Sequence, residues 1–332
     1  MRDDSNHISL ITKIRAMEGK LLKDTDYNNM HSMNSILEIY AYLLEKEEYR
    51  KVFEEYEDIG ELHRNQLEHL LVHTLYEDII KIYKFAAGDE RKFLDIIISR
   101  FEIDTLKQNI AKLGIKNKTN KVSVYEHIFK KHSGISISEL HRANNIKEFA
   151  KLMKGTKYQK LFVELLQKEN MALSDYATAL DIYYFTSVWN TKSKFNPDIE
   201  EIITHIIGTE IDLYNLKCIF RCKKFYDMKP DEIDNYIVPI TYKIKKKQLE
   251  SMIQAESKKS FLHIFKETYY SKLELSFDIK TMDASFERVL NEIHMHFIKN
   301  NPNSLARVYT YFDKKNYEIH FTTRIIENIR YK

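Results

Sequence analysis

The sequence predicts an all-α protein, and three observations lead to this prediction. First, the 332 residues include only seven glycines and four prolines, where average usage would give roughly 23 and 17. Second, the chain contains neither Asn-Gly nor Asp-Gly, the dipeptides typical of tight β-hairpins. Third, apolar residues recur at helical spacing along much of the chain. Long helices with few breaks fit this combination best.

The apolar periodicity is clearest in three stretches, residues 36–44, 67–83 and 161–166. In each, apolar residues recur at i, i+3, i+4 and i+7, which places them on one face of a helix. We therefore predict helices whose apolar faces form the core, with no chemistry implied. Four polar or proline-containing segments are the predicted loops: 112–121, 190–197, 227–234 and 299–304.

Composition narrows the class of protein. The 52 basic and 49 acidic residues give a net charge of +3, and a dedicated nucleic-acid binder usually has a stronger basic excess. No run of about 18 apolar residues occurs, so we expect no transmembrane segment, and the first residues contain no signal core. Cys218 and Cys222 lie four residues apart in a helical stretch, which predicts two ordinary thiols in a reducing compartment.

A short motif recurs three times, at residues 101–107, 211–217 and 317–323. In each segment an apolar residue is followed by a carboxylate and then by isoleucine or leucine. The segments are offset by 110 and 106 residues. This regular offset predicts three related helical repeats that fill the chain. Their expected boundaries are 1–120, 121–228 and 229–332.

The carboxylates of this motif have a predicted structural role. Ser99 lies three residues before Glu102, and Thr209 lies three residues before Asp212. This spacing is that of a capping box, in which the hydroxyl and the carboxylate bind free N–H groups of the first helical turn. Both pairs are therefore predicted to begin helices, whereas the third repeat has Lys315 at the hydroxyl position.

Residue patterns that would support catalysis are absent from the sequence. No two glycines are close enough to form a phosphate-binding loop, and no Gly-x-Ser-x-Gly nucleophile motif occurs. His69 and His73 are four residues apart, but Leu70 follows the first where a zincin helix requires glutamate. We therefore predict no catalytic residue, no cofactor and no metal site.

Two basic groups are candidates for contact with a partner. Four lysines form the densest cluster, and a shorter basic stripe runs along the second copy of the motif. The cluster is interpreted either as a solvated helix face, which we favour, or as a contact with an acidic partner or anionic lipid headgroups. The cluster comprises Lys243, Lys245, Lys246 and Lys247, and the stripe comprises Lys217, Arg221 and Lys224.

The stretch from Gly208 to Tyr226 resembles the C subunit of archaeal and bacterial V/A-type rotary ATPases, the counterpart of the d subunit in the eukaryotic vacuolar enzyme. The core of the resemblance is Glu-Ile-Asp-x-x-Asn-Leu-Lys-x-Ile-x-Arg. Residues 14–17, 138–158 and 324–331 resemble further parts of that family. The candidate interface or family-motif residues in the core are Glu210, Asp212, Asn215, Lys217 and Arg221.

The resemblance implies a fold and a function. The fold would be three similar helical domains arranged around a pseudo-threefold axis as a funnel. The chain would lie on the cytoplasmic face of the membrane, between the D and F shaft subunits and the proteolipid ring. It would pass torque between ATP hydrolysis or synthesis and the transport of protons or sodium ions, binding neither nucleotide, nucleic acid nor small-molecule substrate.

Two other classes of function stay open at this point. A helical adaptor or scaffold unrelated to rotary ATPases would share the composition and the repeats. A helical enzyme or nucleic-acid protein would need a polar cluster assembled from distant segments, which sequence alone does not display.

Overall fold

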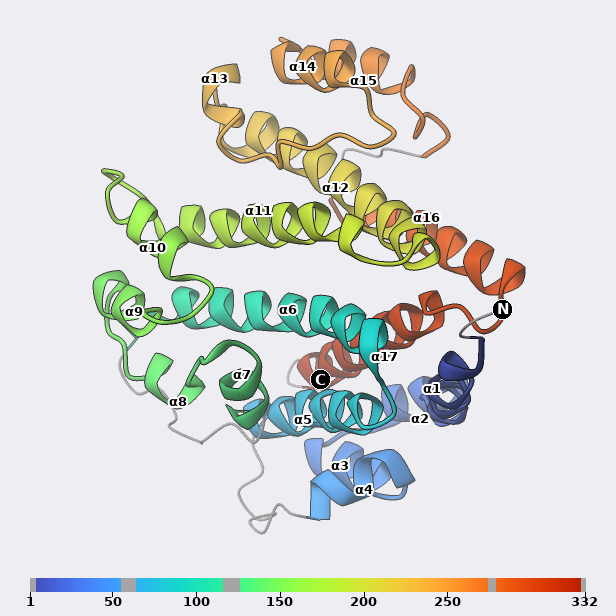
Figure 1. The fold of residues 1–332 in the computed structure, drawn as a ribbon. Helices are drawn as coiled ribbons and strands as arrows, with labels where there is room; N and C mark the ends of the chain where they lie inside the picture. Colours follow the sequence, from blue (N-terminus) through green and yellow to red (C-terminus); the bar gives the residue numbers. More distant parts are fainter. Residues whose placement is uncertain (1–3, 55–63, 116–125, 274–278, 330–332) are drawn as a thin grey trace. The chain divides into compact units, whose positions relative to one another are not determined.

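The computed structural model describes residues 4–54, 64–115, 126–273 and 279–329. Within these ranges the regular elements are α-helices and one short 3₁₀ helix, and there is no strand, which confirms the all-α prediction (Figure 1). The chain forms two compact units. Unit 1 consists of residues 1–94 and 300–332, and unit 2 consists of residues 95–299. The three-repeat boundaries and the funnel stay predictions.

Unit 1 combines the beginning of the chain with its last helix. Helix α17 packs against α5, α1, α2 and α3, so it lies among elements that precede it by more than 200 residues (Figure 1). Buried side chains occur on every turn of its first half, as expected for a helix surrounded by others. The helices of unit 1 are α1 (Asp4–Glu18), α2 (Asp24–Ser32), α3 (Ile36–Leu44), α4 (Glu47–Glu54), α5 (Arg64–Tyr83) and α17 (Ala306–Ile329).

Unit 2 contains the long helices α6, α11, α12 and α16, together with several short helices (Figure 1). Helix α6 begins in unit 1 and continues through unit 2. The helices concerned are α6 (Gly88–Ala111), α7 (Glu126–Ser133), α8 (Ile137–Leu140), α9 (Ile146–Leu152), α10 (Gln159–Leu165), α11 (Leu173–Thr191), α12 (Pro197–Phe225), α13 (Pro230–Ile233), α14 (Lys246–Gln254), α15 (Lys258–Phe265) and α16 (Ile279–Asn300).

Helix α12 is the longest of the described helices, with 29 residues, and its start shows why the helix begins there. The Asn196 side chain accepts a hydrogen bond from the N–H of Ile199 at 3.0 Å, and Pro197 occupies the first turn, where its missing N–H costs nothing. The second half of α12 packs on α14, α15 and α16 through a core that includes Ile219, Met252 and Phe261. Helix α12 is therefore the helix against which the other helices of this part of unit 2 pack.

The predicted helices and breaks agree with the structure where it describes them. Residues 36–44 form α3, 67–83 lie in α5, and 161–165 lie in α10. Breaks separate α11 from α12 and α16 from α17, while the predicted loop 227–234 contains the short helix α13. The predicted loop 112–121 lies partly outside the described residues. No described helix is long and apolar enough to span a membrane.

Candidate functional site

The three carboxylates of the repeated motif occupy matching places in the structure. Glu102, Asp212 and Glu318 each lie well inside a long helix, α6, α12 and α17 respectively. Each residue is only 1% exposed. A buried carboxylate requires hydrogen-bond donors or a counter-charge, and each of the three receives donors from a segment distant in sequence. We call these residues the anchor carboxylates.

Asp212 binds mainly backbone groups. Its two oxygens accept the N–H groups of Tyr242, Lys243 and Ile244 at 3.0, 2.6 and 3.0 Å. The hydroxyl of Tyr270 donates to the same carboxylate at 3.2 Å. Burial raises the pKa of Asp212, and the three backbone N–H groups oppose that rise only in part. Asp212 thus fixes the backbone that leads into α14.

Asn215, one helical turn further along α12, fixes the residues just before that segment. Its amide nitrogen donates to the carbonyls of Val238 and Ile240 at 3.0 and 3.3 Å, and its oxygen accepts the N–H of Val238 at 2.8 Å. Gly208 allows the close approach of this segment, because a Cβ there would lie 2.6 Å from the ring of Tyr242. Residues 238–244 are therefore held along the side of α12.

Glu102 is satisfied by cations. It receives the ring nitrogen Nδ1 of His132 at 2.8 Å, the Lys157 ammonium at 2.7 Å and the Tyr158 hydroxyl at 2.9 Å. Burial alone would raise the pKa of Glu102, but His132 and Lys157 outweigh it and lower that pKa. Burial lowers the pKa of His132, yet hydrogen bonds to Asp95 and Glu102 raise it overall to about 9. His132 is thus protonated and paired at neutral pH.

Glu318 combines both kinds of donor. It accepts the ammonium of Lys315 and the backbone N–H of Leu22, each at 2.6 Å, and it also accepts the hydroxyl of Tyr49. Lys315 is itself 1% exposed, and its ammonium lies 4.5 Å from the centre of the Tyr49 ring. This anchor connects the last helix of the chain with residues near its start, within unit 1.

A tyrosine hydroxyl is common to all three anchors. These tyrosines were not identified from the sequence, although a signal exists. Each begins a Tyr-x-Lys triplet, and each follows the N-cap residue of a short helix by 13 or 14 residues. The tyrosines are Tyr49, Tyr158 and Tyr270, and the corresponding N-cap residues are Ser35, Asn145 and Ser257.

The predicted capping boxes are wrong. Ser99 and Glu102 lie inside α6, and Thr209 and Asp212 lie inside α12. In a helix interior the N–H groups already bind carbonyls four residues back, so these side chains turn to other partners. Ser99, for example, accepts a hydrogen bond from the Lys157 ammonium at 2.9 Å. The same three-residue spacing in the third repeat forms the buried pair of Lys315 with Glu318.

Most of the family-motif residues act inside unit 2. Glu210 is 6% exposed and binds Arg100 at 2.6 Å. Arg100 precedes Glu210 by 110 residues and therefore holds the same repeat position. Asn215 is fully buried, and half-buried Lys217 binds Asp283 at 2.6 Å. The candidate interface or family-motif residues Glu210, Asp212 and Asn215 are buried, so their contacts lie within the chain, whereas Arg221 is exposed.

The four clustered lysines are all exposed. The ammonium of Lys243 lies 4.8 Å from the ring centre of Tyr242 and 5.5 Å from that of Tyr269. Lys246 lies 3.8 Å from Glu250, one turn further along α14, and both side chains are largely in solvent. The structure therefore places Lys243, Lys245, Lys246 and Lys247 together on the surface where α14 begins.

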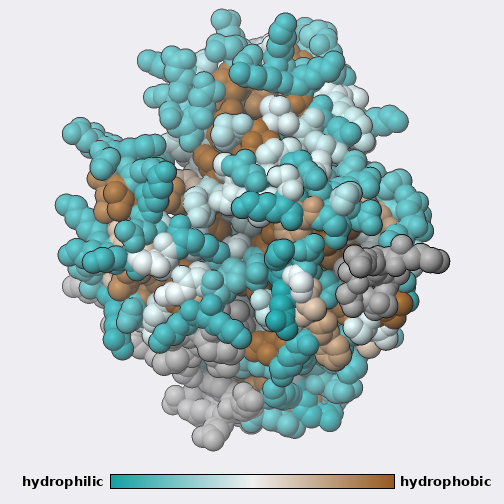
Figure 2. Space-filling view, in the orientation of Figure 1, coloured by the Kyte–Doolittle hydropathy of each residue, from teal (hydrophilic) through white to brown (hydrophobic). Residues whose placement is uncertain are grey.

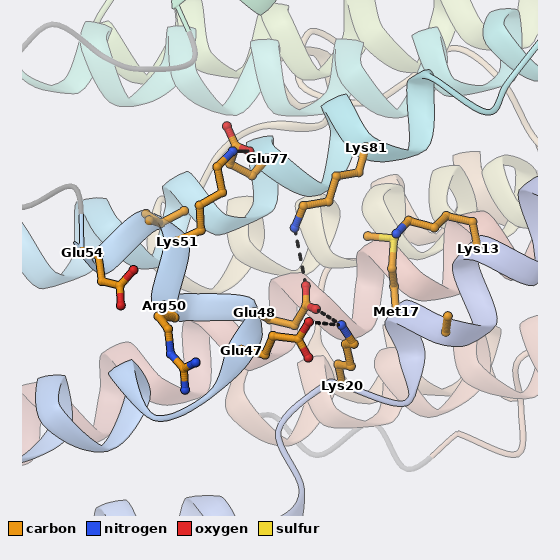
Figure 3. A pocket seen from close by; sticks show the side chains of 12 residues that line it. Lys13, Met17, Lys20, Glu47, Glu48, Arg50, Lys51, Glu54, Glu77 and Lys81 are labelled. Carbon is orange, nitrogen blue, oxygen red and sulfur yellow. Dashed lines mark hydrogen bonds and ion pairs between the residues drawn. The ribbon is translucent and has the colours of Figure 1, made fainter.

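A cavity of about 650 Å³ lies in unit 1 between α1, α4 and α5. Figure 3 shows that the side chains of Lys20, Glu47, Glu48 and Lys81 point toward one another. Lys20 binds Glu47 and Glu48 at 3.0 and 2.8 Å, and Lys81 lies 3.5 Å from Glu48. These pairs attach α4 to α1 and α5. Among the residues that the structure describes, no group of three or more His, Cys, Asp or Glu side chains is arranged to hold a metal ion.

Comparison with known proteins identifies the family. The family model described as ATP synthase (C/AC39) subunit matches residues 10–332. The chain belongs to this family. Membership confirms the resemblance to the C subunit of V/A-type ATPases that residues 208–226 predicted.

Curated relatives match this chain over most of its length. Three of them, each named as the C subunit of an A-type ATP synthase, illustrate the identities and coverages found. The relative from Methanosphaera stadtmanae is 21% identical, with 92% of this chain and 80% of the relative covered. The relative from Methanothermobacter thermautotrophicus is 23% identical over the same shares of the two chains. The relative from Methanococcoides burtonii is 22% identical, with 95% and 88% covered.

Proposed function

We propose that this C/AC39 family member is a non-catalytic central-stalk subunit of a V/A-type rotary ATPase. It would couple the D and F shaft subunits to the proteolipid ring, so that torque from ATP hydrolysis or synthesis is linked to proton or sodium transport. The observation that carries the proposal is the family match over residues 10–332. The coupling role itself is our inference from the resemblance and from the construction of the fold.

The construction of the fold suits the transmission of torque. A coupling part must resist deformation, and long helices with few glycines or prolines supply stiffness. Within α12 the one glycine, Gly208, lies against the Tyr242 ring. The anchor carboxylates then join each long helix to a distant segment through buried hydrogen bonds. Such buried, satisfied contacts favour a single arrangement of the helices.

We infer a peripheral position on the cytoplasmic side of the membrane, in keeping with the absence of a spanning helix among the described residues. Contacts with other subunits would then use exposed charged side chains, of which Arg221 and Lys224 are examples. Charged contacts of this kind weaken as the salt concentration rises.

Copurification tests the proposal. The tagged chain is expressed in its native host, membranes are solubilised in a mild detergent, and the proteins that copurify are identified. We expect the nucleotide-binding A and B subunits, the D and F subunits and the ring proteolipid. Recovery of the chain alone, or with soluble proteins only, would contradict the proposal and favour a helical adaptor unrelated to rotary ATPases.

Site-specific photocrosslinking then maps the contacts. A photoreactive amino acid at Arg221 or at Lys224 should crosslink to another subunit of the complex. The same amino acid at Lys160, whose side chain is 90% exposed and lies on α10, serves as the comparison position. If all three positions behave alike, the crosslinks report general proximity and not a specific contact.

A further inference from the structure

Residues 243–272, which we call the lysine hairpin, carry eight lysines against three glutamates, a net charge of +5. The whole chain has a net charge of only +3, so the remaining residues together carry −2. The hairpin consists of α14 and α15, which pack against each other. In Figure 2 the outer side of this hairpin, at the top of the view, is covered by hydrophilic side chains. Positive charge is thus concentrated in one small part of unit 2.

The lysines occupy positions that weaken the helices that carry them. Lys245 is the N-cap of α14, which begins with Lys246 and Lys247, and helix α15 begins with Lys258 and Lys259. Neither helix has an acid in its first turn. A cation at a helix N-terminus opposes the helix dipole, with an effect of roughly 0.3–1 kcal/mol. Helix stability does not explain five lysines at these positions.

The rest of the chain supplies an internal comparison. Two pairs of short helices, α2 with α3 and α8 with α9, precede the tyrosines of the other two anchors just as α14 and α15 precede Tyr270. All four of those helices have an acid in the first turn, as the dipole favours. Lysine is also rarer at the starts of these four helices: Lys23 caps α2 and Lys147 lies in the first turn of α9, each beside a first-turn acid. The same local fold is therefore made without clustered, unbalanced lysines at the helix starts, which indicates that the lysines of the hairpin serve binding.

The type of residue favours a lipid surface over a protein. No arginine occurs between Arg221 and Arg288, although arginine is enriched and lysine depleted in protein–protein interfaces. Lysine clusters bind anionic lipid headgroups through general electrostatic attraction, which needs no fork-shaped hydrogen bonding. Tyr269 is 67% exposed beside the ammonium of Lys243, and tyrosine is enriched at the membrane–water boundary.

We propose that the lysine hairpin binds the surface of an anionic lipid bilayer directly. Asp212 and Asn215 of α12 hold residues 238–244 through hydrogen bonds to their backbone. The segment that leads into the hairpin is therefore already ordered before binding. The contact is made with lipid headgroups and requires no other subunit. It does not depend on the proposed coupling function.

Vesicle sedimentation of the purified full chain tests this proposal. The chain is mixed with vesicles of phosphatidylcholine alone or of phosphatidylcholine with phosphatidylglycerol, at low and at high salt. We expect binding to the anionic vesicles only, and loss of binding at high salt. Changing Lys243, Lys245 and Lys247 to glutamine should weaken binding roughly a hundredfold.

The control removes the same charge elsewhere in unit 2. Lys151, Lys154 and Lys160 are exposed, and their replacement by glutamine should leave vesicle binding nearly unchanged. Circular dichroism verifies that both triple variants are folded. Equal loss in the two variants, unchanged binding in the hairpin variant, or no preference of the wild-type chain for anionic vesicles would each overturn the proposal. In those cases the hairpin is better assigned to an acidic protein partner.

Discussion

Glu102 and Asp212 hold the same repeat position in two long helices of unit 2, yet different kinds of donor satisfy them. Glu102 binds the charged groups of His132 and Lys157, whereas Asp212 binds three backbone N–H groups. Accordingly, the pKa of Glu102 is lowered and that of Asp212 is raised, although burial by itself would raise the pKa of both carboxyl groups.

This difference separates the contacts that all copies of the motif share from those that are specific to each copy. Each copy keeps a buried carboxylate in mid-helix and a tyrosine hydroxyl that donates to it. The remaining donors differ from copy to copy. The fold thus requires an acceptor at this place, and any donor set that satisfies a buried charge can complete it.

The largest effect is expected at Glu318, where the donor set includes a buried ammonium. Changing Glu318 to alanine leaves Lys315 buried without its carboxylate. Removal of one partner of a buried ion pair typically costs about 3–5 kcal/mol. Urea unfolding followed by circular dichroism measures this loss of the free energy of unfolding.

Glu47 provides the control in the same unit. Its side chain is 76% exposed in its ion pair with Lys20, so Glu47→Gln should cost less than about 1 kcal/mol. A further variant changes Glu318 and Lys315 together to leucine and methionine, and it should recover part of the stability. Equal losses for Glu318→Ala and Glu47→Gln would refute the anchor role of Glu318.

A smaller loss is expected at Asp212, where the donors are neutral. Asp212→Ala leaves three backbone N–H groups without their acceptor, and we expect a loss of about 3 kcal/mol. Asp212→Asn keeps one acceptor oxygen and should lose less. Hydrogen exchange should accelerate at the amides of Tyr242, Lys243 and Ile244 in particular. Glu250→Ala, at an exposed position in the same unit, should leave their exchange unchanged.

The third effect depends on pH and concerns the Glu102 anchor. The folded pKa of His132, about 9, lies above its ordinary value of 6.5, so the folded state holds the proton more tightly than the unfolded state. This stabilisation is fully present below pH 6.5 and is lost as pH rises through 9. The shift corresponds to at most about 3 kcal/mol. Unfolding free energies measured across this pH range should fall in the wild type and change less in His132→Gln.

The smallest expected effect is the difference in pKa shift between the two carboxyl groups. Carbon NMR of the side-chain carboxyls should show Glu102 titrating below its ordinary 4.5 and Asp212 titrating above its ordinary 3.8. Acidification should therefore weaken the Glu102 contribution to stability and favour the folded state at Asp212. Upward pKa shifts at both sites would show that burial, and not the donor set, controls the two pKa values.

The fold class and the repeated carboxylate were predictable from the sequence because both depend on local patterns. Scarcity of glycine and proline indicates helices, and apolar spacing locates their faces. The role of Glu102 and Asp212 was not predictable in the same way. Periodicity shows that a residue is helical without showing how far the helix extends in front of it, so the Ser-x-x-Glu spacing in α6 resembled a helix start.

The donors of the anchors lie beyond the reach of local patterns. Tyr158 follows Glu102 by 56 residues, and Tyr49 precedes Glu318 by 269. No periodicity connects positions so far apart. The Tyr-x-Lys triplet that all three tyrosines begin is too short to stand out in a chain with 22 tyrosines. Its meaning became visible once the tyrosines were found at equivalent anchors.

The separation of Tyr49 from Glu318 also sets an order of events during synthesis. Ribosomes add about 5–20 residues per second, so Tyr49 and Leu22 wait roughly 10–50 s for their carboxylate, given the 269 residues between Tyr49 and Glu318. The partners of Glu102 and Asp212 are made within 58 residues of them. On the ribosome, unit 2 can complete its anchors while the first helices of unit 1 still lack Glu318. The apolar faces of these early helices therefore stay without the last helix longest, and they are the part of a nascent chain that needs the longest protection from aggregation.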